Sequence, residues 1–81
     1  MAKQNVKVRE KKLGREKAWG QHEPGLIHID PRLNSRRRLL YLMHELLHEF
    51  VPEFSESKVR DVSSDMAEVL WKDHWRRVHK P

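Results

Sequence analysis

The sequence predicts an α+β fold in which a small antiparallel β segment is followed by two helices. The first third of the chain holds short β-branched runs separated by turn residues, which is typical of strands joined by tight turns. From residue 34 onward apolar residues recur every three or four positions, the period of an amphipathic helix, and Pro52 divides this part in two. At 81 residues the chain has room for one core, so we expect a single domain over residues 1–81.

The β segment is expected to contain two or three antiparallel strands. Valines alternate with charged residues near the N-terminus, so we expect residues 1–17 to form either a short edge strand or a flexible segment that leads to the core. The dipeptide Pro24-Gly25 is typical of a tight turn, and the run at 26–29, rich in β-branched residues, is typical of a strand. Pro31 then ends this strand, because proline cannot donate a hydrogen bond to a sheet.

The two helices are expected to form an antiparallel hairpin, because the connection between them is short. The first is predicted to run from Asn34 or Ser35, either of which can cap it, to Phe50. The second is predicted to begin after the cap Ser55 and to run to about Val78. The apolar face of the first helix comprises Leu39, Met43, Leu46, Leu47 and Phe50. The apolar stripe of the second comprises Val59, Val62, Met66, Val69 and Leu70.

Composition narrows the functional classes. The chain has no cysteine, which excludes a disulfide framework and a thiolate metal site. No apolar run approaches the roughly 18 residues of a membrane span, and the N-terminus lacks the apolar core of a signal peptide. We therefore expect a cytoplasmic protein without a membrane partner. The net charge of +5, from 17 Lys and Arg against 12 Asp and Glu, favours acidic partners, nucleic acid included.

The first predicted helix contains the motif His-Glu-x-x-His, at His44, Glu45 and His48. Residues four apart lie one above the other on a helix, so the two imidazoles can bind one ion. Neutral imidazole is a good zinc ligand, and a glutamate directly after the first histidine can reach a metal-bound water and take its proton. The motif therefore predicts a zinc site with Glu45 as its general base.

The stretch from Trp19 to Trp71 resembles the zincin metallopeptidases, above all the compact HExxH proteins of bacteria and phages. This resemblance implies zinc as the cofactor, the two motif histidines as its ligands, Glu45 as the general base, and a peptide or protein as the substrate. In such proteins an edge strand precedes the active-site helix and lines the substrate cleft. Residues 25–30 take the place of that strand here.

The third ligand has two main candidates. Glu68 follows His48 at a spacing similar to that in thermolysin-like gluzincins, but in a continuous helix it lies about two turns too far from the hairpin. Glu56 stands at the start of the second helix, level with His48, and is the preferred candidate. Its alternative role is that of a first-turn acid complementing the helix dipole. The remaining candidates are Asp61, Asp65 and Asp73, or no protein ligand.

Positions or contacts can also be predicted for several residues outside the motif. Asp73 falls within the projected apolar stripe, so either it hydrogen-bonds a ligand histidine, or the helix frays or bends there, or an arginine pairs with it. His28 is expected to face outward from its strand, with a contact to substrate or metal as the alternative. Trp71 and Trp75 are expected to pack on the β segment or in an oligomer contact. The histidines without ligand spacing to the motif, expected at the surface, are His22, His74 and His79.

The leading interpretation is a zinc-dependent metallopeptidase-like protein in which a metal-activated water attacks a peptide bond. The alternative is a catalytically weak or inactive zinc-stabilised binding module for a protein or nucleic-acid partner. Two features favour this alternative. A zincin cleft normally needs a second subdomain, for which 81 residues leave little room. The run Arg36 to Arg38 in the first turn of a helix is either a solvated face or a contact for an acidic or phosphate-bearing partner.

Overall fold

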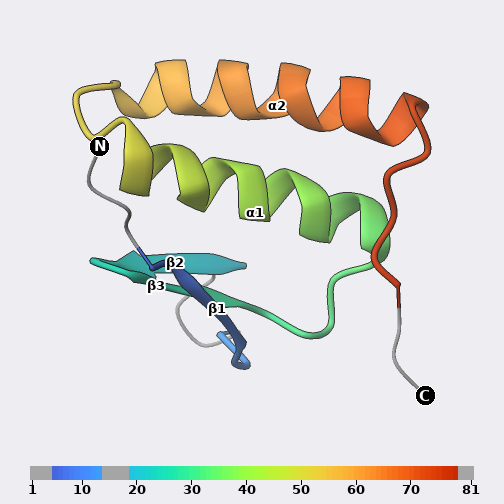
Figure 1. Cartoon of the computed structure of the whole chain (residues 1–81), viewed down its shortest axis with the longest axis horizontal. Helices are drawn as coiled ribbons and strands as arrows, with labels where there is room; N and C mark the ends of the chain where they lie inside the picture. The colour runs from blue at the N-terminus through green and yellow to red at the C-terminus, as the bar shows by residue number, and fades with distance from the viewer. Residues whose placement is uncertain (1–4, 14–18, 79–81) are drawn as a thin grey trace.

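The computed structural model, which describes residues 5–13 and 19–78, has three short strands followed by two helices. The strands are β1 (Lys7–Glu10), β2 (Gly20–Glu23) and β3 (Leu26–Ile29), and the helices are α1 (Ser35–Phe50) and α2 (Glu56–Lys72). Figure 1 shows three layers, with the sheet on one side of α1 and α2 on the other. The predicted α+β class is confirmed.

The sheet is mixed, with the strand order β1-β3-β2. Strands β2 and β3 form the expected antiparallel hairpin, whose turn places Gly25 at a φ of 77°, a conformation that favours glycine. Strand β1 pairs parallel with β3, which departs from the antiparallel pairing expected for the whole segment. The reason is topological: β1 and β2 flank β3 on opposite sides and run in opposite directions.

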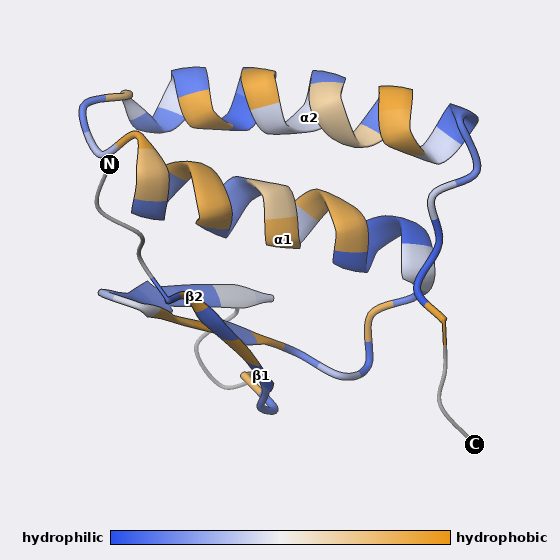
Figure 2. Ribbon diagram, in the orientation of Figure 1, coloured by the Kyte–Doolittle hydropathy of each residue, from blue (hydrophilic) through white to orange (hydrophobic). Residues whose placement is uncertain are grey.

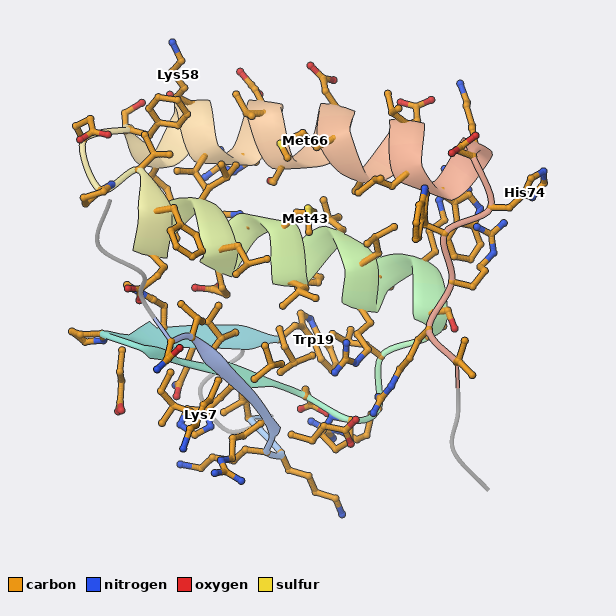
Figure 3. The ribbon with its side chains drawn as sticks, in the orientation of Figure 1. Lys7, Trp19, Met43, Lys58, Met66 and His74 are labelled. Atoms are coloured by element: carbon orange, nitrogen blue, oxygen red, sulfur yellow. The ribbon has the colours of Figure 1, made fainter. Side chains whose placement is uncertain are left out.

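The core of the sheet lies on the face toward α1. Ile27 and Ile29 of the central strand are fully buried, and their neighbours in register on β2 are His22 and Gly20. Residues directly opposite each other share one face of a sheet, so these β2 residues also face α1. In Figure 3, Trp19 lies between the sheet and α1. The β hairpin thus covers the helix that carries the motif.

Helix α1 begins and ends where the sequence predicts. Asn34 is its cap and accepts a hydrogen bond from the Arg37 backbone N–H at 2.9 Å. The helix ends at Phe50, one residue before the turn that contains Pro52. Because α1 packs against the sheet and α2 at once, its apolar residues are shared between two sides, and Met43 lies between the helices (Figure 3). Phe50, at the end of the predicted face, is 55% exposed.

Helix α2 begins after the predicted cap Ser55 but ends at Lys72, so the expected extension to Val78 is wrong. His74 adopts a left-handed φ of 68°, which stops the helix. Buried Val59, Ser63 and Ala67 form the line that faces α1.

The predicted stripe of α2 is therefore partly wrong. Met66 is 41% exposed and Val69 is 67% exposed, because small side chains let the helices approach on the neighbouring line of α2. Figure 2 shows apolar colouring on the outer helix at several turns. In the described ranges 5–13 and 19–78, neither helix is long and apolar enough to cross a membrane.

Candidate metal centre

The two motif histidines meet on one side of α1. Their positions, one turn apart on the helix, place the Nε2 atoms of His44 and His48 3.2 Å from each other. The rings stand edge to face, with centroids 4.9 Å apart and an interplanar angle of 66°. The side chains of His44 and His48 are 19% and 28% exposed, so solvent reaches both rings. This pair provides two nitrogen donors aimed at one point.

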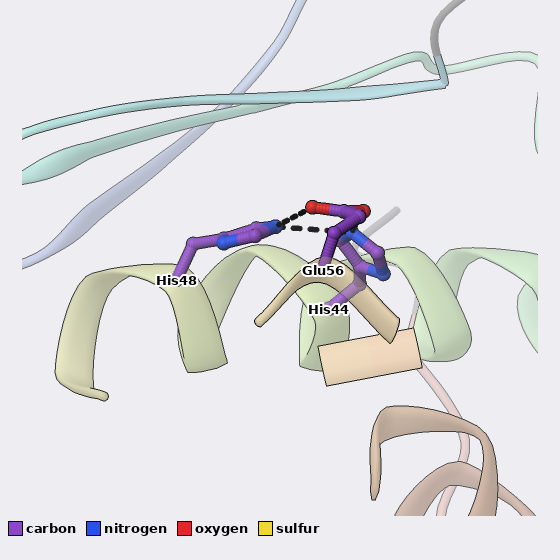
Figure 4. Close-up of side chains that lie close together, drawn as sticks. All are labelled: His44, His48 and Glu56. Atoms are coloured by element: carbon purple, nitrogen blue, oxygen red, sulfur yellow. Dashed lines mark hydrogen bonds and ion pairs between the residues drawn. The ribbon is translucent and has the colours of Figure 1, made fainter. Parts of the chain in front are cut away.

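Glu56 brings a carboxylate to this pair from the first residue of α2. Its Oε1 lies 3.0 Å from Nε2 of His44, and its Oε2 lies 3.1 Å from Nε2 of His48 (Figure 4). The helix start that places Glu56 there is fixed by Ser55, which accepts a hydrogen bond from the Lys58 backbone N–H. The hairpin turn thus sets the first residue of α2 beside the motif.

These three side chains form a group that could hold a metal ion. Their ligand atoms all lie within 4.8 Å of one another, and no cysteine takes part. Two donors bound to zinc at tetrahedral angles, each about 2.05 Å from the ion, are separated by about 3.3 Å. The Nε2–Nε2 separation of 3.2 Å is close to that value, and Glu56 presents a different carboxylate oxygen to each histidine, at 3.0 and 3.1 Å. The donor set and the geometry both fit zinc.

Glu68 lies away from this group. Its carboxylate pairs with Lys72 at 2.9 Å, an i, i+4 contact on the solvent side of α2, and the hydrogen bond from the Lys72 ammonium lowers the pKa of Glu68. Glu68 also lines a surface hollow with Arg36 and Arg37, at the opposite end of α1 from the hairpin turn. The other candidates, Asp61, Asp65 and Asp73, are exposed and take no part in the group found among the described residues.

Glu45 is the one buried residue of α1, at 7% exposure. Burial raises the pKa of its carboxyl group, and the nearby charges of His44, His48 and His22 partly oppose this. A Cβ atom placed on Gly20 of β2 would lie 3.1 Å from both Cγ and Oε2 of Glu45. Any side chain at position 20 would therefore crowd this carboxylate. Strand β2 covers Glu45 because its residue there is glycine.

His22 lies beside the site, so the expectation that it is a plain surface residue is wrong. Its Nε2 is 2.7 Å from Oε1 of Glu49, and its ring stacks at 24° on that of His48, with centroids 6.3 Å apart. Glu49 also accepts the Gly25 backbone N–H at 3.0 Å. The Gly25 N–H and the hydrogen bond from His22 lower the pKa of Glu49. This link fixes the β hairpin to the end of α1.

A sequence signal for His22 exists in the hairpin register. The turn at Pro24-Gly25 pairs His22 with Ile27, so an apolar β3 residue that faces the helix indicates the same face for His22. The expected edge strand also differs: residues 25–30 include the central strand β3, and the strand at the sheet edge near the motif is β2.

The remaining candidates lie away from the histidine pair. Alternation places His28 on the sheet face opposite the buried Ile27 and Ile29, and its Nδ1 is buried without a hydrogen-bond partner in the described ranges. Asp73 is the C-cap of α2 rather than a residue inside the helix, and its carboxylate accepts a hydrogen bond from the Trp75 indole. His74 is exposed. His79 lies outside the described residues.

Trp71 packs against two arginines, whereas the indole of Trp75 donates a hydrogen bond to Asp73. The guanidinium of Arg76 lies 3.3 Å from the ring centroid of Trp71, and that of Arg36 lies 5.8 Å from it. Trp75 stands beyond the end of α2 and is 61% exposed. Helix α2 contacts α1 and not the strands, so the expected packing of Trp71 on the β segment is not observed. Trp75 follows the end of α2, so its expected position inside the helix is wrong.

Comparison of the sequence with protein-family models and with curated proteins, and of the fold with solved structures, finds no match.

Proposed function

We propose that this chain is a zinc-dependent metallopeptidase-like hydrolase, with His44, His48 and Glu56 as the metal ligands and Glu45 as the general base. The observation that carries the proposal is the convergence of two imidazole nitrogens and one carboxylate at separations of 3.0 to 3.2 Å. Two histidines and one glutamate are a donor set of catalytic zinc sites, and three protein ligands leave a tetrahedral position open.

Zinc bound there would supply Lewis acidity and lower the pKa of a bound water toward neutrality. The residues of this chain have separate tasks. Glu45 follows His44 directly and is shielded by β2, so its carboxylate can receive a proton and return it to the leaving amine. The histidine pair and Glu56 orient the site, since all three groups come from elements fixed by helix caps.

Strand β2 supports a peptide as the substrate class. It is an edge strand of the described sheet and lies against α1 next to Glu45. An extended peptide can add to such an edge through main-chain hydrogen bonds, which hold it without regard to its sequence. His22 on the same strand lies beside His48 and is placed to contact a bound chain.

A second candidate function is a zinc-stabilised binding module. The observation that favours it is the origin of the ligands, two on α1 and one on the first residue of α2, so that a bound ion cross-links the helical hairpin. A bound metal contributes directly to the folding free energy of a small domain. In this case the ion stabilises the fold, and the surface of the protein binds the partner.

The Glu45→Gln variant separates the two candidates. It keeps the shape of the side chain but cannot accept the proton, so a peptidase variant should retain about one zinc per chain and lose cleavage of unfolded protein. Glu53→Gln, at an exposed position in the hairpin turn, is the matched control and should cleave like wild type. Zinc content is measured by atomic emission, and cleavage by mass spectrometry of the products. Equal inactivity of wild type and both variants, with unfolding on chelation, would favour the binding module.

A further inference from the structure

A cavity of about 230 Å³ lies between the N-terminal half of α1 and the segment that follows α2. Figure 1 shows this segment passing beside the start of α1. Three arginines line the cavity, Arg38, Arg76 and Arg77, together with the apolar side chains of Leu39, Leu42 and Trp75. Positions 38, 39 and 42 lie on the face of α1 roughly opposite His44 and His48, at about 100° per residue. The cavity is therefore separate from the candidate metal centre.

Arg38 provides the first reason to expect a ligand. Its side chain is only 16% exposed, and its Nε atom is buried with no hydrogen-bond partner among the residues that the structure describes. A buried donor without a partner costs free energy, which a bound acceptor would recover. Burial lowers the pKa of the Arg38 guanidinium, and the nearby charge of Arg77 lowers it further. An anion in the cavity would relieve both effects.

The positive charge at the cavity is only partly balanced by the protein itself. Glu10 of β1 forms an ion pair with Arg77, and the same oxygen lies 3.9 Å from Nη2 of Arg38. Arg76 donates to the Trp71 carbonyl oxygen at 2.7 Å, and this contact leaves its charge unneutralised. Three guanidinium groups thus line the cavity, and two carboxylates stand beside its lining residues in the described part of the chain: Glu10, next to Arg77 and Arg38, and Asp73, which accepts a hydrogen bond from the Trp75 indole. Guanidinium is the group best suited to bind carboxylate or phosphate oxygens through paired hydrogen bonds.

The rest of the wall is apolar and partly open. Leu39 and Leu42 form one side, and Trp75, 61% exposed, forms the other. Exposed tryptophan beside aliphatic side chains is a favourable surface for a small apolar or aromatic group. The cavity volume is close to the lower limit for small-molecule pockets, so its occupant is small.

We propose that this cavity binds a small ligand with an oxyanion head on an apolar body, the head meeting Arg38 and Arg77 and the body resting between Leu39 and Trp75. The head is a carboxylate or a phosphate ester. This proposal does not depend on the metal centre. Glu10 holds the two arginines in the absence of ligand and competes with the ligand for them.

Four probes test both parts of the ligand in the full chain. Phenylacetate and phenyl phosphate combine head and body, whereas acetate lacks the body and benzyl alcohol lacks the charge. Binding is followed by nuclear magnetic resonance through the Trp75 indole N–H signal. Phenylacetate or phenyl phosphate should bind at least tenfold more tightly than acetate and benzyl alcohol, and the stronger of the two identifies the head. Equal binding of benzyl alcohol would overturn the proposal.

Two variants with opposite expected effects on probe affinity test the charge of the cavity. Arg77→Gln should weaken binding of the better probe about five- to tenfold, and Glu10→Gln should strengthen it about threefold because it removes the competing carboxylate. Arg60→Gln removes the same charge at an exposed position on α2 and should change binding less than twofold. Equal weakening by Arg60→Gln and Arg77→Gln would overturn the proposal, since the effect would then be general charge. Binding that survives Arg77→Gln but is lost with a chelator would place the probe at the metal centre instead.

Discussion

Removal of the Glu56 carboxylate should weaken zinc binding at least tenfold. The carboxylate oxygens of this side chain lie 3.0 and 3.1 Å from the two histidine nitrogens, and no other carboxylate of the described residues joins this group. Zinc sites with four ligands bind with about 10–16 kcal/mol near neutral pH, or roughly 2.5–4 kcal/mol per ligand. Because a tenfold change in affinity corresponds to about 1.4 kcal/mol, full loss of one ligand predicts a loss of roughly 60- to 700-fold.

The expected loss is smaller than this limit, because Glu56 is 58% exposed and water can take its place. We therefore expect a 10- to 100-fold increase in the zinc Kd of Glu56→Ala. The Kd is measured by competition with a chromophoric chelator. Glu56→Gln should behave similarly, since an amide oxygen is a much weaker ligand for zinc.

Glu68→Ala is the matched control for this prediction. Glu68 lies on the same helix, is 52% exposed and is engaged with Lys72 rather than with the histidines. Its removal should change the zinc Kd less than twofold, and circular dichroism of the metal-free variants should be alike. An equal loss in the two variants, or a larger loss in Glu68→Ala, would refute the assignment of the third ligand. Small and equal effects would mean that water or another acid completes the shell.

Three further predictions concern the same architecture. His44→Ala or His48→Ala should each bring zinc well below one equivalent by atomic emission, and stoichiometric zinc in both variants would contradict the site. Gly20→Ala should displace the Glu45 carboxylate by a few tenths of an ångström, which should reduce cleavage roughly tenfold while zinc content stays constant; loss of zinc instead would contradict the separate roles. The Asp30→Asn variant should have a lower thermal unfolding midpoint than wild type at pH 7, and the difference between the two midpoints should narrow below about pH 4. A difference that does not change with pH would refute an electrostatic origin of this stabilisation.

The sign of the pH effect follows from the surroundings of Asp30. This carboxylate is fully buried, and its pKa is held well below the usual range by hydrogen bonds from Arg32, with a further contribution from the Leu13 N–H. Burial opposes this shift and is outweighed. A group with a lowered pKa stabilises the folded state above its ordinary pKa, and this contribution is lost as the pH falls through the folded-state pKa. The asparagine variant has no such pH-dependent contribution.

Local features of the fold could be predicted from the sequence. The start and end of α1, the cap Ser55 and the meeting of Glu56 with the histidine pair all follow from signals within one helical hairpin. Caps, helical period and the reach of a short turn are properties of adjacent residues. For that reason the arrangement around His44 follows from the residues of this one segment.

Long-range features could not be predicted in the same way. The parallel pairing of β1 with β3 depends on which side of β3 each strand joins, and nothing in the four residues of β1 specifies that. Helix α2 ends at Lys72 because His74, two residues later, adopts a left-handed conformation, and no glycine or proline stands nearby to signal this end. The burial of Glu45 depends on Gly20, which comes from a distant part of the chain.

The three proposed ligands all lie between residues 44 and 56, within one stretch of chain around a turn. The loop that a bound ion closes is short, so its entropic cost is small and its formation needs no contact with the sheet. Metal capture can then precede docking of the β hairpin during folding. Shielding of Glu45, by contrast, requires β2 to be in place. A hairpin of residues 34–73 alone would thus retain the three proposed metal ligands but leave Glu45 uncovered, and Glu45 would become shielded only when the sheet is added.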